Sequence, residues 1–157
     1  MPALKQKRDV YEYISGYVDG EGCFSVSFSK RDKLTIGWET KPSFSVSQNE
    51  DRAQVLYLLQ KIFKCGFIRR DYSDKTLKYE VRSLDDLVNN IIPHFEKYPL
   101  ISEKRNDFNH FKAICFLMQK NLHKEKDGLK KILDYAFLMN PSGKRKYSKN
   151  DIKNTLR

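Results

Sequence analysis

The chain has 157 residues, of which 39% are hydrophobic and 13% aromatic, which is enough for one globular domain with a real core. Its net charge of +10 predicts a polyanionic partner and favours nucleic acid over a membrane surface or a merely soluble exterior. No apolar run approaches the roughly 20 residues needed to span a bilayer, and the N-terminal residues lack the apolar core of a secretory signal.

The cysteines and histidines do not form a recognisable disulfide or zinc pattern. The cysteines are odd in number and contain no C-x-x-C pair, and the histidines do not complete a zinc site: Cys23, Cys65, Cys115, His94, His110 and His123. We expect reduced thiols in a reducing compartment, which is the cytoplasm of a bacterium or archaeon or an organelle matrix or stroma, and no secretion.

The first predicted element is a helix over residues 10–21. Its apolar residues recur at i, i+3, i+4, i+7 and i+8 from Val10. The neighbouring face carries small and acidic residues, namely Ser15, Gly16, Asp19 and Gly20. Glycine costs about 1 kcal/mol relative to alanine inside a helix, so we expect this face to pack closely on another helix.

Two carboxylates, Asp19 and Glu21, lie at the end of this helix. The helix dipole disfavours each of them there by about 0.3–1 kcal/mol. A divalent metal held by carboxylate and backbone oxygens would offset this cost. A solvated D-G-E-G turn is the alternative, and these residues alone leave it open.

A strand and its hairpin partner follow the turn. Residues 23–29 alternate between apolar side chains and serines, the tip is expected at residues 31–33, and the second strand at 34–47. The polar face of this ribbon carries Ser25, Ser27, Ser29, Arg31, Lys41, Ser43 and Ser45. A two-stranded ribbon fits the major groove, and hydroxyls bond to base edges. We therefore expect DNA contact, with a merely soluble face as the alternative.

The remaining chain repeats this pattern and then turns helical. A helix begins near Asn49, a second hairpin covers residues 67–72 and 76–82, and helices are expected at 84–95, 108–122 and 128–138. The second hairpin concentrates cations, namely Arg69, Arg70, Lys75 and Lys78. One of the two arginines is expected to bind guanine and the other a phosphate. The basic segment from Asn140 is either a solvated tail or a short helix along DNA phosphates.

The segment I-S-G-Y-V-D-G-E-G, residues 14–22, resembles the L-A-G-L-I-D-A-D-G motif of the LAGLIDADG homing endonucleases. Ile14 replaces Leu, Ser15 replaces Ala, and Glu21 replaces the second Asp. The resemblance implies an α+β fold of αββαββα topology with a saddle-shaped antiparallel sheet and extra C-terminal helices. It corresponds to a single domain over residues 1–157, with a core at about 8–121 and C-terminal helices and a basic tail at 122–157.

The same resemblance implies the catalytic residues. Glu21 and the Gly20 carbonyl would bind Mg²⁺, a site that Mn²⁺ or Ca²⁺ could also occupy. Gln48 and Arg52 match positions that flank the scissile phosphate, and the segment around Y-P-L-I-S-E-K matches the one that keeps an active-site lysine. We assign that role to Lys104, with Lys97 as the alternative.

The implied function is site-specific cleavage of double-stranded DNA. A single motif implies a homodimer whose faces of Ser15, Gly16, Asp19 and Gly20 meet, and two-fold symmetry implies a long pseudo-palindromic site. Both strands would be hydrolysed with divalent metal ions at the dimer interface. The alternatives are an RNA maturase that assists splicing of its host intron, with intron RNA as partner, and a catalytically inactive DNA-binding regulator. No membrane partner is expected.

Overall fold

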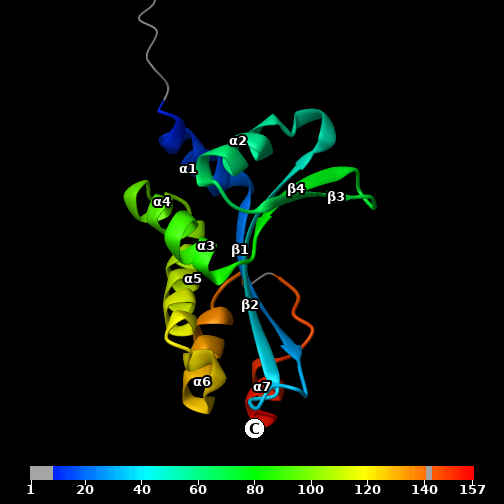
Figure 1. The fold of residues 1–157 in the computed structure, drawn as a ribbon, viewed down its shortest axis with the longest axis vertical. Helices are drawn as coiled ribbons and strands as arrows, with labels where there is room; N and C mark the ends of the chain where they lie inside the picture. Colours follow the sequence, from blue (N-terminus) through cyan, green and yellow to red (C-terminus); the bar gives the residue numbers. More distant parts are fainter. Residues whose placement is uncertain (1–8, 141–142) are drawn as a thin grey trace, which may run out of the picture.

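The computed structural model describes residues 9–140 and 143–157, which form one antiparallel four-stranded sheet with helices on one of its faces (Figure 1). The strand order is β1-β2-β4-β3. The strands are β1 (Gly22–Lys30), β2 (Trp38–Asn49), β3 (Phe67–Asp71) and β4 (Thr76–Val81). The main helices are α1 (Val10–Glu21), α2 (Gln54–Phe63), α5 (Lys104–Gln119) and α6 (Lys126–Ala136).

The element order confirms the expected αββαββα topology. Helix α1, the β1–β2 hairpin and α2 make the first repeat, and β3, β4 and the segment from α3 (Leu84–Asp86) to α4 (Ile92–Lys97) complete the second. Between α3 and α4 the backbone makes a π-type turn, η2 (Leu87–Ile91). Pro93 follows that turn and has no backbone N–H to donate, which accounts for the local change of hydrogen-bond pattern.

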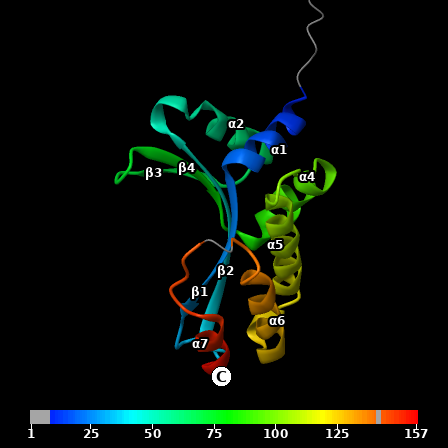
Figure 2. The ribbon, with the colours of Figure 1, turned by 180° about the vertical axis from the view of Figure 1, so that it is seen from behind.

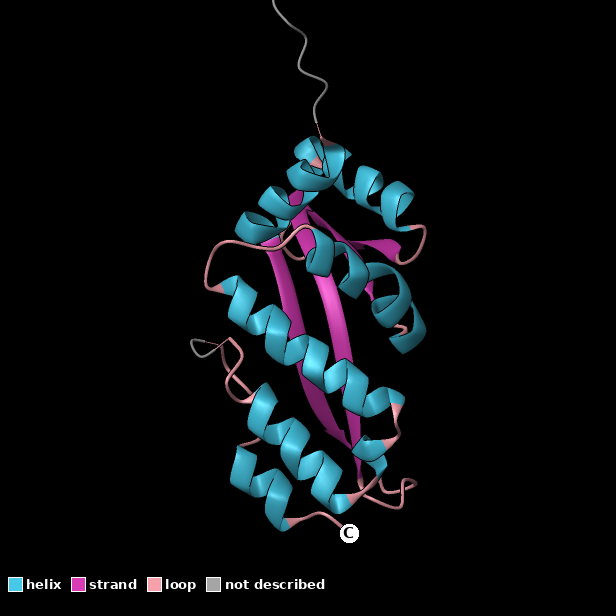
Figure 3. Cartoon of the chain, turned by 90° about the vertical axis from the view of Figure 1, so that its left-hand side faces the viewer, coloured by secondary structure: helices cyan, strands magenta, loops and turns pink. Residues whose placement is uncertain are grey.

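The core lies between the sheet and the helices. Figure 3 looks onto the helical layer and shows the helices in front of the strands. Phe24 of β1 occupies the centre, with its ring centroid 5.1 Å from that of Phe44, 5.3 Å from Phe108 and 5.2 Å from Phe111. Each such buried side chain contributes about 1.5–3 kcal/mol. The alternation of strand residues therefore sends aromatic rings to the helices and leaves the serines on the opposite face.

The β1–β2 hairpin differs from expectation at its tip. We expected a tight turn at residues 31–33, but a longer loop covers residues 31–37, and β2 begins at Trp38. The loop closes because Arg31 N donates to Gly37 O at 2.9 Å and Gly37 N to Leu34 O at 3.0 Å. Gly37 adopts φ +85°, which glycine allows at no steric cost. The hairpin is in register from Gly22 opposite Val46 to Lys30 opposite Trp38.

The chain end forms a short helix that packs against this loop, so it is not a solvated tail, and its contact with DNA phosphates stays a prediction. Helix α7 (Lys149–Asn154) buries Ile152, and Figure 2 shows it beside the far end of β1 and β2. Trp38 Nε1 donates to Thr155 Oγ1 at 3.1 Å. Arg157 Nη2 donates to the carbonyls of Asp32 at 3.0 Å and Leu34 at 3.1 Å.

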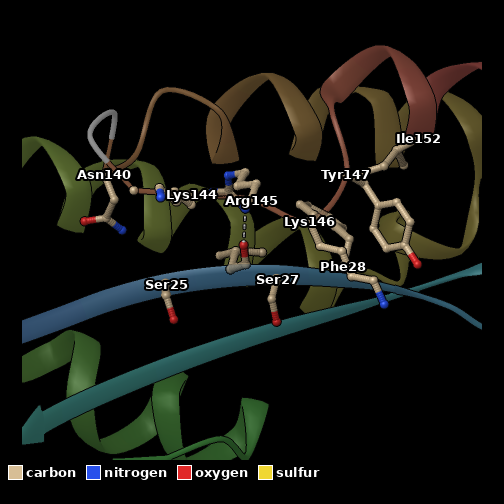
Figure 4. Close-up of a pocket in the computed structure, with 11 residues that line it drawn as sticks. Ser25, Ser27, Phe28, Asn140, Lys144, Arg145, Lys146, Tyr147 and Ile152 are labelled. Atoms are coloured by element: carbon tan, nitrogen blue, oxygen red, sulfur yellow. Dashed lines mark hydrogen bonds between the residues drawn. The ribbon is translucent and has the colours of Figure 1, made fainter.

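Asn140 and Arg145, which follow α6, bind the free edge of β1 (Figure 4). Asn140 Nδ2 donates to Phe24 O at 2.8 Å, and Arg145 Nη1 donates to Val26 O at 2.7 Å. Arg145 also donates to Ala136 O, so its guanidinium is held within the subunit. These bonds satisfy edge carbonyls that would otherwise be open to another strand.

Among the described residues, no helix is both long and apolar enough to cross a membrane.

Candidate functional site

Helix α1 presents an open stripe and ends at the acidic position of the motif. Asp9 caps its N-terminus by accepting from Tyr11 N at 3.0 Å. Gly16 and Gly20 are exposed, and a Cβ built on either would meet nothing within 4 Å. Glu21 is the last helical residue and is exposed. The stripe therefore has room for the close approach of a second helix backbone.

Ser15 does not belong to this stripe, which corrects the expected interface. It is 3% exposed, and its hydroxyl donates to the Tyr98 carbonyl at 2.6 Å. Because the single hydroxyl proton is used there, the 3.1 Å contact with His94 Nε2 must have the histidine as donor. Burial lowers the pKa of His94 to about 4, so the ring is neutral at physiological pH. Ser15 thus fastens α1 to its own subunit.

Asp19 also has partners within the subunit. Its carboxylate accepts from Ile101 N at 2.8 Å, Ser102 N at 3.1 Å and the Ser102 hydroxyl, which lies closer still. Burial raises the pKa of Asp19, but these hydrogen bonds and the charge of Lys104 outweigh it, so the pKa is below its usual value. Asp19 therefore holds the start of α5 against the end of α1, and its place in the helix interface stays a prediction.

The ammonium of Lys104, the predicted active-site lysine, lies at the C-terminus of α1. Its Nζ donates to Val18 O and Asp19 O, both at 3.0 Å. The last carbonyls of a helix have no intrahelical partner and carry a partial negative charge, so they hold an ammonium well. Lys97, the alternative, is exposed, and its ammonium lies 5.6 Å from the centroid of the Tyr98 ring. Of the two lysines, Lys104 is the one with hydrogen bonds to the motif helix.

Gln48 is also brought to α1, at the end of β2. Its Nε2 donates to Tyr17 Oη at 2.7 Å, and its Oε1 accepts from Asn49 N at 2.9 Å. Tyr17 fixes this side chain, a role that the sequence did not reveal because Tyr17 was read only as an apolar helix position. Arg52 lies in the short η1 turn (Glu50–Arg52) before α2, and it is exposed without an ion pair among the described residues.

The face of the sheet that turns away from the helices contains a groove of about 660 Å³. Seven expected DNA-binding residues line it, namely Ser25, Ser27, Lys41, Ser43, Ser45, Arg69 and Lys78. Cys23 lines the end nearest to α1. Burial raises the pKa of its thiol, and the positive charges of Lys104 and Lys78 act in the opposite direction. The groove therefore extends to Cys23, whose thiol is close enough to Lys104 for the charge of the lysine to act on it.

Four other expected DNA-binding residues lie outside the groove lining. Arg70 forms an ion pair with Glu50, because the two-residue period of β3 sends neighbours to opposite faces and only Arg69 enters the groove. Ser29 lies farther along β1, opposite Glu39. Arg31 forms an ion pair with Glu39 at 2.8 Å. Lys75 lies at the β3–β4 turn with φ +58°.

The groove also contains charged residues that the sequence reading missed. Glu80 and Arg82 line it beside Arg69, and Glu39 lies near its other end. The alternation of Lys78, Glu80 and Arg82 along and just beyond β4 is a period-two pattern that could have revealed them.

The donors for a metal ion are few. Among the described residues, no group of three or more His, Cys, Asp or Glu side chains could hold a metal. Mg²⁺ in nucleic-acid enzymes is commonly held by one or two carboxylates, with water and phosphate completing its shell. The exposed Glu21 carboxylate beside the terminal carbonyls of α1 matches such a sparse donor set.

Comparison with known proteins gives consistent matches. The family model described as LAGLIDADG endonuclease matches residues 14–115. A Neurospora crassa protein named probable intron-encoded endonuclease 2 is 38% identical over 129 residues, which are 82% of this chain and 28% of that protein. This chain spans only about a quarter of the length of the first curated relatives it matches.

Two solved structures show the same fold. The homing endonuclease I-TnaI is 34% identical with a TM-score of 0.80, and the match covers 92% of this chain and 94% of that one. The LAGLIDADG homing endonuclease I-LtrWI, bound to its target DNA, is 38% identical with a TM-score of 0.81, and the match covers 83% of this chain and 44% of that one.

Proposed function

Because the chain belongs to the LAGLIDADG endonuclease family, we propose that it is a site-specific endonuclease that hydrolyses both strands of duplex DNA. One observation carries the proposal. The groove on the uncovered sheet face runs toward the end of α1, which carries Glu21 as its last residue and Lys104 on its terminal carbonyls. A DNA duplex in that groove would bring its backbone to these two groups.

The groove supplies binding and sequence reading. Its lysines and arginines attract the phosphate backbone, and this part of the affinity falls as salt rises. Its serine hydroxyls offer donors and acceptors to base edges, directly or through water. The sheet is curved (Figure 1), and a curved surface fits a rounded DNA duplex better than a flat sheet would.

Glu21 and the Gly20 carbonyl would hold Mg²⁺. When bound, the metal would lower the pKa of an attacking water and neutralise charge on the scissile phosphate. Glutamate keeps the charge of the family's commoner aspartate and adds one methylene, which extends its reach by about 1.5 Å.

The surrounding side chains would act on the phosphate and the water. Lys104, fixed on the carbonyls of Val18 and Asp19, would stabilise the extra negative charge of the transition state from a preset position. Gln48, oriented by Tyr17, would hold the attacking water. Arg52 is exposed without an ion pair and would be drawn to the same phosphate on binding.

A second motif helix would complete the site. Gly16 and Gly20 leave α1 open for it, and in this proposal a second copy of the chain supplies it. The match to 94% of I-TnaI supports a unit of this size, whereas the match covers 44% of I-LtrWI. Two identical subunits would read a roughly palindromic site.

The decisive experiment is a cleavage selection from a randomised duplex library in Mg²⁺, with the wild type and Glu21→Gln in parallel. The wild type should yield one cleaved, roughly palindromic consensus. Glu21→Gln should bind that consensus and cleave it about 100-fold or more slowly, because the carboxylate that would hold the metal is lost. Cleavage by Glu21→Gln at the wild-type rate would refute the assignment of Glu21.

The binding measurements also separate this function from its rivals. A DNA-binding regulator would bind duplex tightly without metal and never break a strand. An RNA maturase would shift its intron RNA in a gel more strongly than any duplex, and Glu21→Gln would leave that binding unchanged.

A further inference from the structure

Glu80 is a buried acid on the face of the sheet that carries the groove. It lies on β4, paired with Ser45 of β2 and Phe67 of β3, and only 4% of its surface is exposed. An acid on a face that meets a polyanion weakens binding unless cations neutralise it. A buried carboxylate also needs partners, because desolvation of an unpaired charge is very unfavourable. Its partners are therefore the key to its role.

Two arginines hold the carboxylate, one on each oxygen. Arg69 Nε lies 3.4 Å from Oε1, and Arg82 Nε donates to Oε2 at closer range. Both contacts use Nε, which is the guanidinium nitrogen nearest to the side-chain stem. Among the described residues, neither arginine makes a further hydrogen bond through its terminal amino groups. The Arg69 side chain is 41% exposed and the Arg82 side chain is 60% exposed, so these amino groups are open to a ligand in the groove.

Arg82 has a second support. Its guanidinium carbon lies 5.4 Å from the centroid of the Phe67 ring, at a distance typical of a cation–π contact. Arg82 is therefore held between an acid and an aromatic ring, and Arg69 by the same acid from the neighbouring strand. Arg70, the next residue of β3, is instead bound to Glu50. The alternation of β3 decides which arginine enters the groove, and Glu80 holds the side chains of the two that do, Arg69 and Arg82.

We propose that Glu80 is a positioning residue that fixes Arg69 and Arg82 so that their terminal amino groups read guanine. The proposal rests on the DNA-cleaving function proposed above and names its specificity residues. An arginine donates two parallel hydrogen bonds to guanine O6 and N7, which requires a defined guanidinium plane. Without Glu80, each flexible side chain would turn to the nearest phosphate, which carries no sequence information.

The geometry favours this role over direct reading by Glu80 itself. A glutamate can accept from cytosine N4, but here both carboxylate oxygens already accept from arginine, and the residue is buried. The two roles give the same base pair in a consensus, so they must be separated by variants. If Glu80 acts through the arginines, its effect disappears when the arginines are absent.

The test compares base preferences of the full chain in a randomised duplex selection. The variants are Glu80→Gln, Arg69→Gln, Arg82→Gln, the double arginine variant and the triple variant, with Glu39→Gln as the control. Glu39 lines the same groove and pairs with Arg31 at 2.8 Å. Bound duplexes are recovered in buffer with Ca²⁺ and cleaved duplexes in buffer with Mg²⁺, and both sets are sequenced. Thermal unfolding checks that each variant is folded.

Glu80→Gln should lose about 10-fold of the guanine preference at the positions affected by Arg69→Gln or Arg82→Gln, and nowhere else. Affinity for non-specific duplex should be undiminished, since a negative charge is removed. In the triple variant, Glu80→Gln should add nothing. Glu39→Gln should leave these positions unchanged.

Three results would overturn the inference: an unchanged preference in Glu80→Gln, an equal loss at all positions, or a full additional effect of Glu80→Gln without the arginines. If Glu80→Gln does not fold, Arg69→Lys with Arg82→Lys replaces it. Lysine keeps the charge but has no fork, so guanine preference should fall while the salt dependence stays, and retained preference would overturn the inference. A wild type that selects no sequence would instead refute the proposed function.

Discussion

Lys104 on α5 donates from its Nζ to the backbone carbonyl of Asp19 at 3.0 Å, so a cation from one helix rests on the C-terminal end of another. The Asp19 side chain in turn accepts from Ile101 N and Ser102 N, just before α5. The two contacts run in opposite directions between the same two elements. They fix the ammonium on the carbonyl of Asp19, two residues before Glu21. Among the described residues Glu21 forms no ion pair, which leaves its carboxylate free for a metal ion.

The role of Lys104 can be tested with Lys104→Met, which keeps the length of the side chain and removes its charge. Cleavage should slow by about 100-fold or more because preset stabilisation of transition-state charge is lost. Stability should fall by only about 1 kcal/mol, the usual contribution of a cation at a helix C-terminus. Single-turnover cleavage and urea unfolding measure the two effects. Lys97→Met is the control, and an equal loss in both variants would leave Lys104 without a special role.

The helix pairing can be tested with Gly16→Leu. Within the subunit a Cβ at this exposed position meets nothing within 4 Å, so the variant should fold at least as stably as the wild type, with about 1 kcal/mol gained from helix propensity. In a helix pair the same side chain would separate the backbones. Light scattering should therefore show loss of the dimer, together with loss of cleavage. Gln119→Leu adds a similar exposed side chain on α5 and should change neither, and a dimeric Gly16→Leu would contradict the pairing.

The buried histidine predicts an acid-sensitive fold. Burial lowers the pKa of His94 from 6.5 to about 4, so the unfolded chain binds this proton more readily than the folded one. The stability contributed by neutral His94 is complete above pH 6.5 and is lost as the pH falls toward 4. Between pH 7 and 4.5 the expected loss is about 2 kcal/mol.

His94→Gln provides the comparison, because glutamine can still donate to Ser15 but does not titrate. Urea unfolding at both pH values should show that the wild type loses about 2 kcal/mol more than this variant. The pKa of His123 is also lowered by burial, but that group is common to both proteins. Equal acid sensitivity in the two proteins would show that His94 is not the responsible group.

The C-terminal clamp predicts a local effect of Arg157→Ala. The variant loses two hydrogen bonds to loop 31–37, from Arg157 Nη2 to the carbonyls of Asp32 and Leu34. The expected destabilisation is about 1–2 kcal/mol. Hydrogen exchange should rise in the loop and in the distal half of the β1–β2 hairpin, while β3 and β4 stay protected. Lys153→Ala is the control. It removes an exposed ion pair between Lys153 of α7 and Asp134 of α6, and it should leave hydrogen exchange in the loop unchanged.

Local patterns in the sequence predicted much of the fold and of the site. The period of 3.6 predicted helix α1. The period of two in β1 placed Phe24 and Val26 inward and Ser25 and Ser27 outward, as observed. Such patterns fail where a residue's role depends on a partner far along the chain. Ser15 and Asp19 shared small size and position with the glycines, but residues about 80 positions later took up their side chains.

By itself, the sequence determined the element order, the inward and outward faces of β1 and β2 and the glycine-marked helix that ends at Glu21, because these follow from local periodicity and backbone preference. Only the tertiary structure decided that Ser15 is buried and that Asp19 binds the segment before α5. It also decided that Arg69 lines the groove and Arg70 does not, that Glu80 binds two arginines and that the chain end binds a hairpin loop. These choices depend on which charged or polar group lies across a strand pair or a helix contact. That information exists only once distant segments have packed.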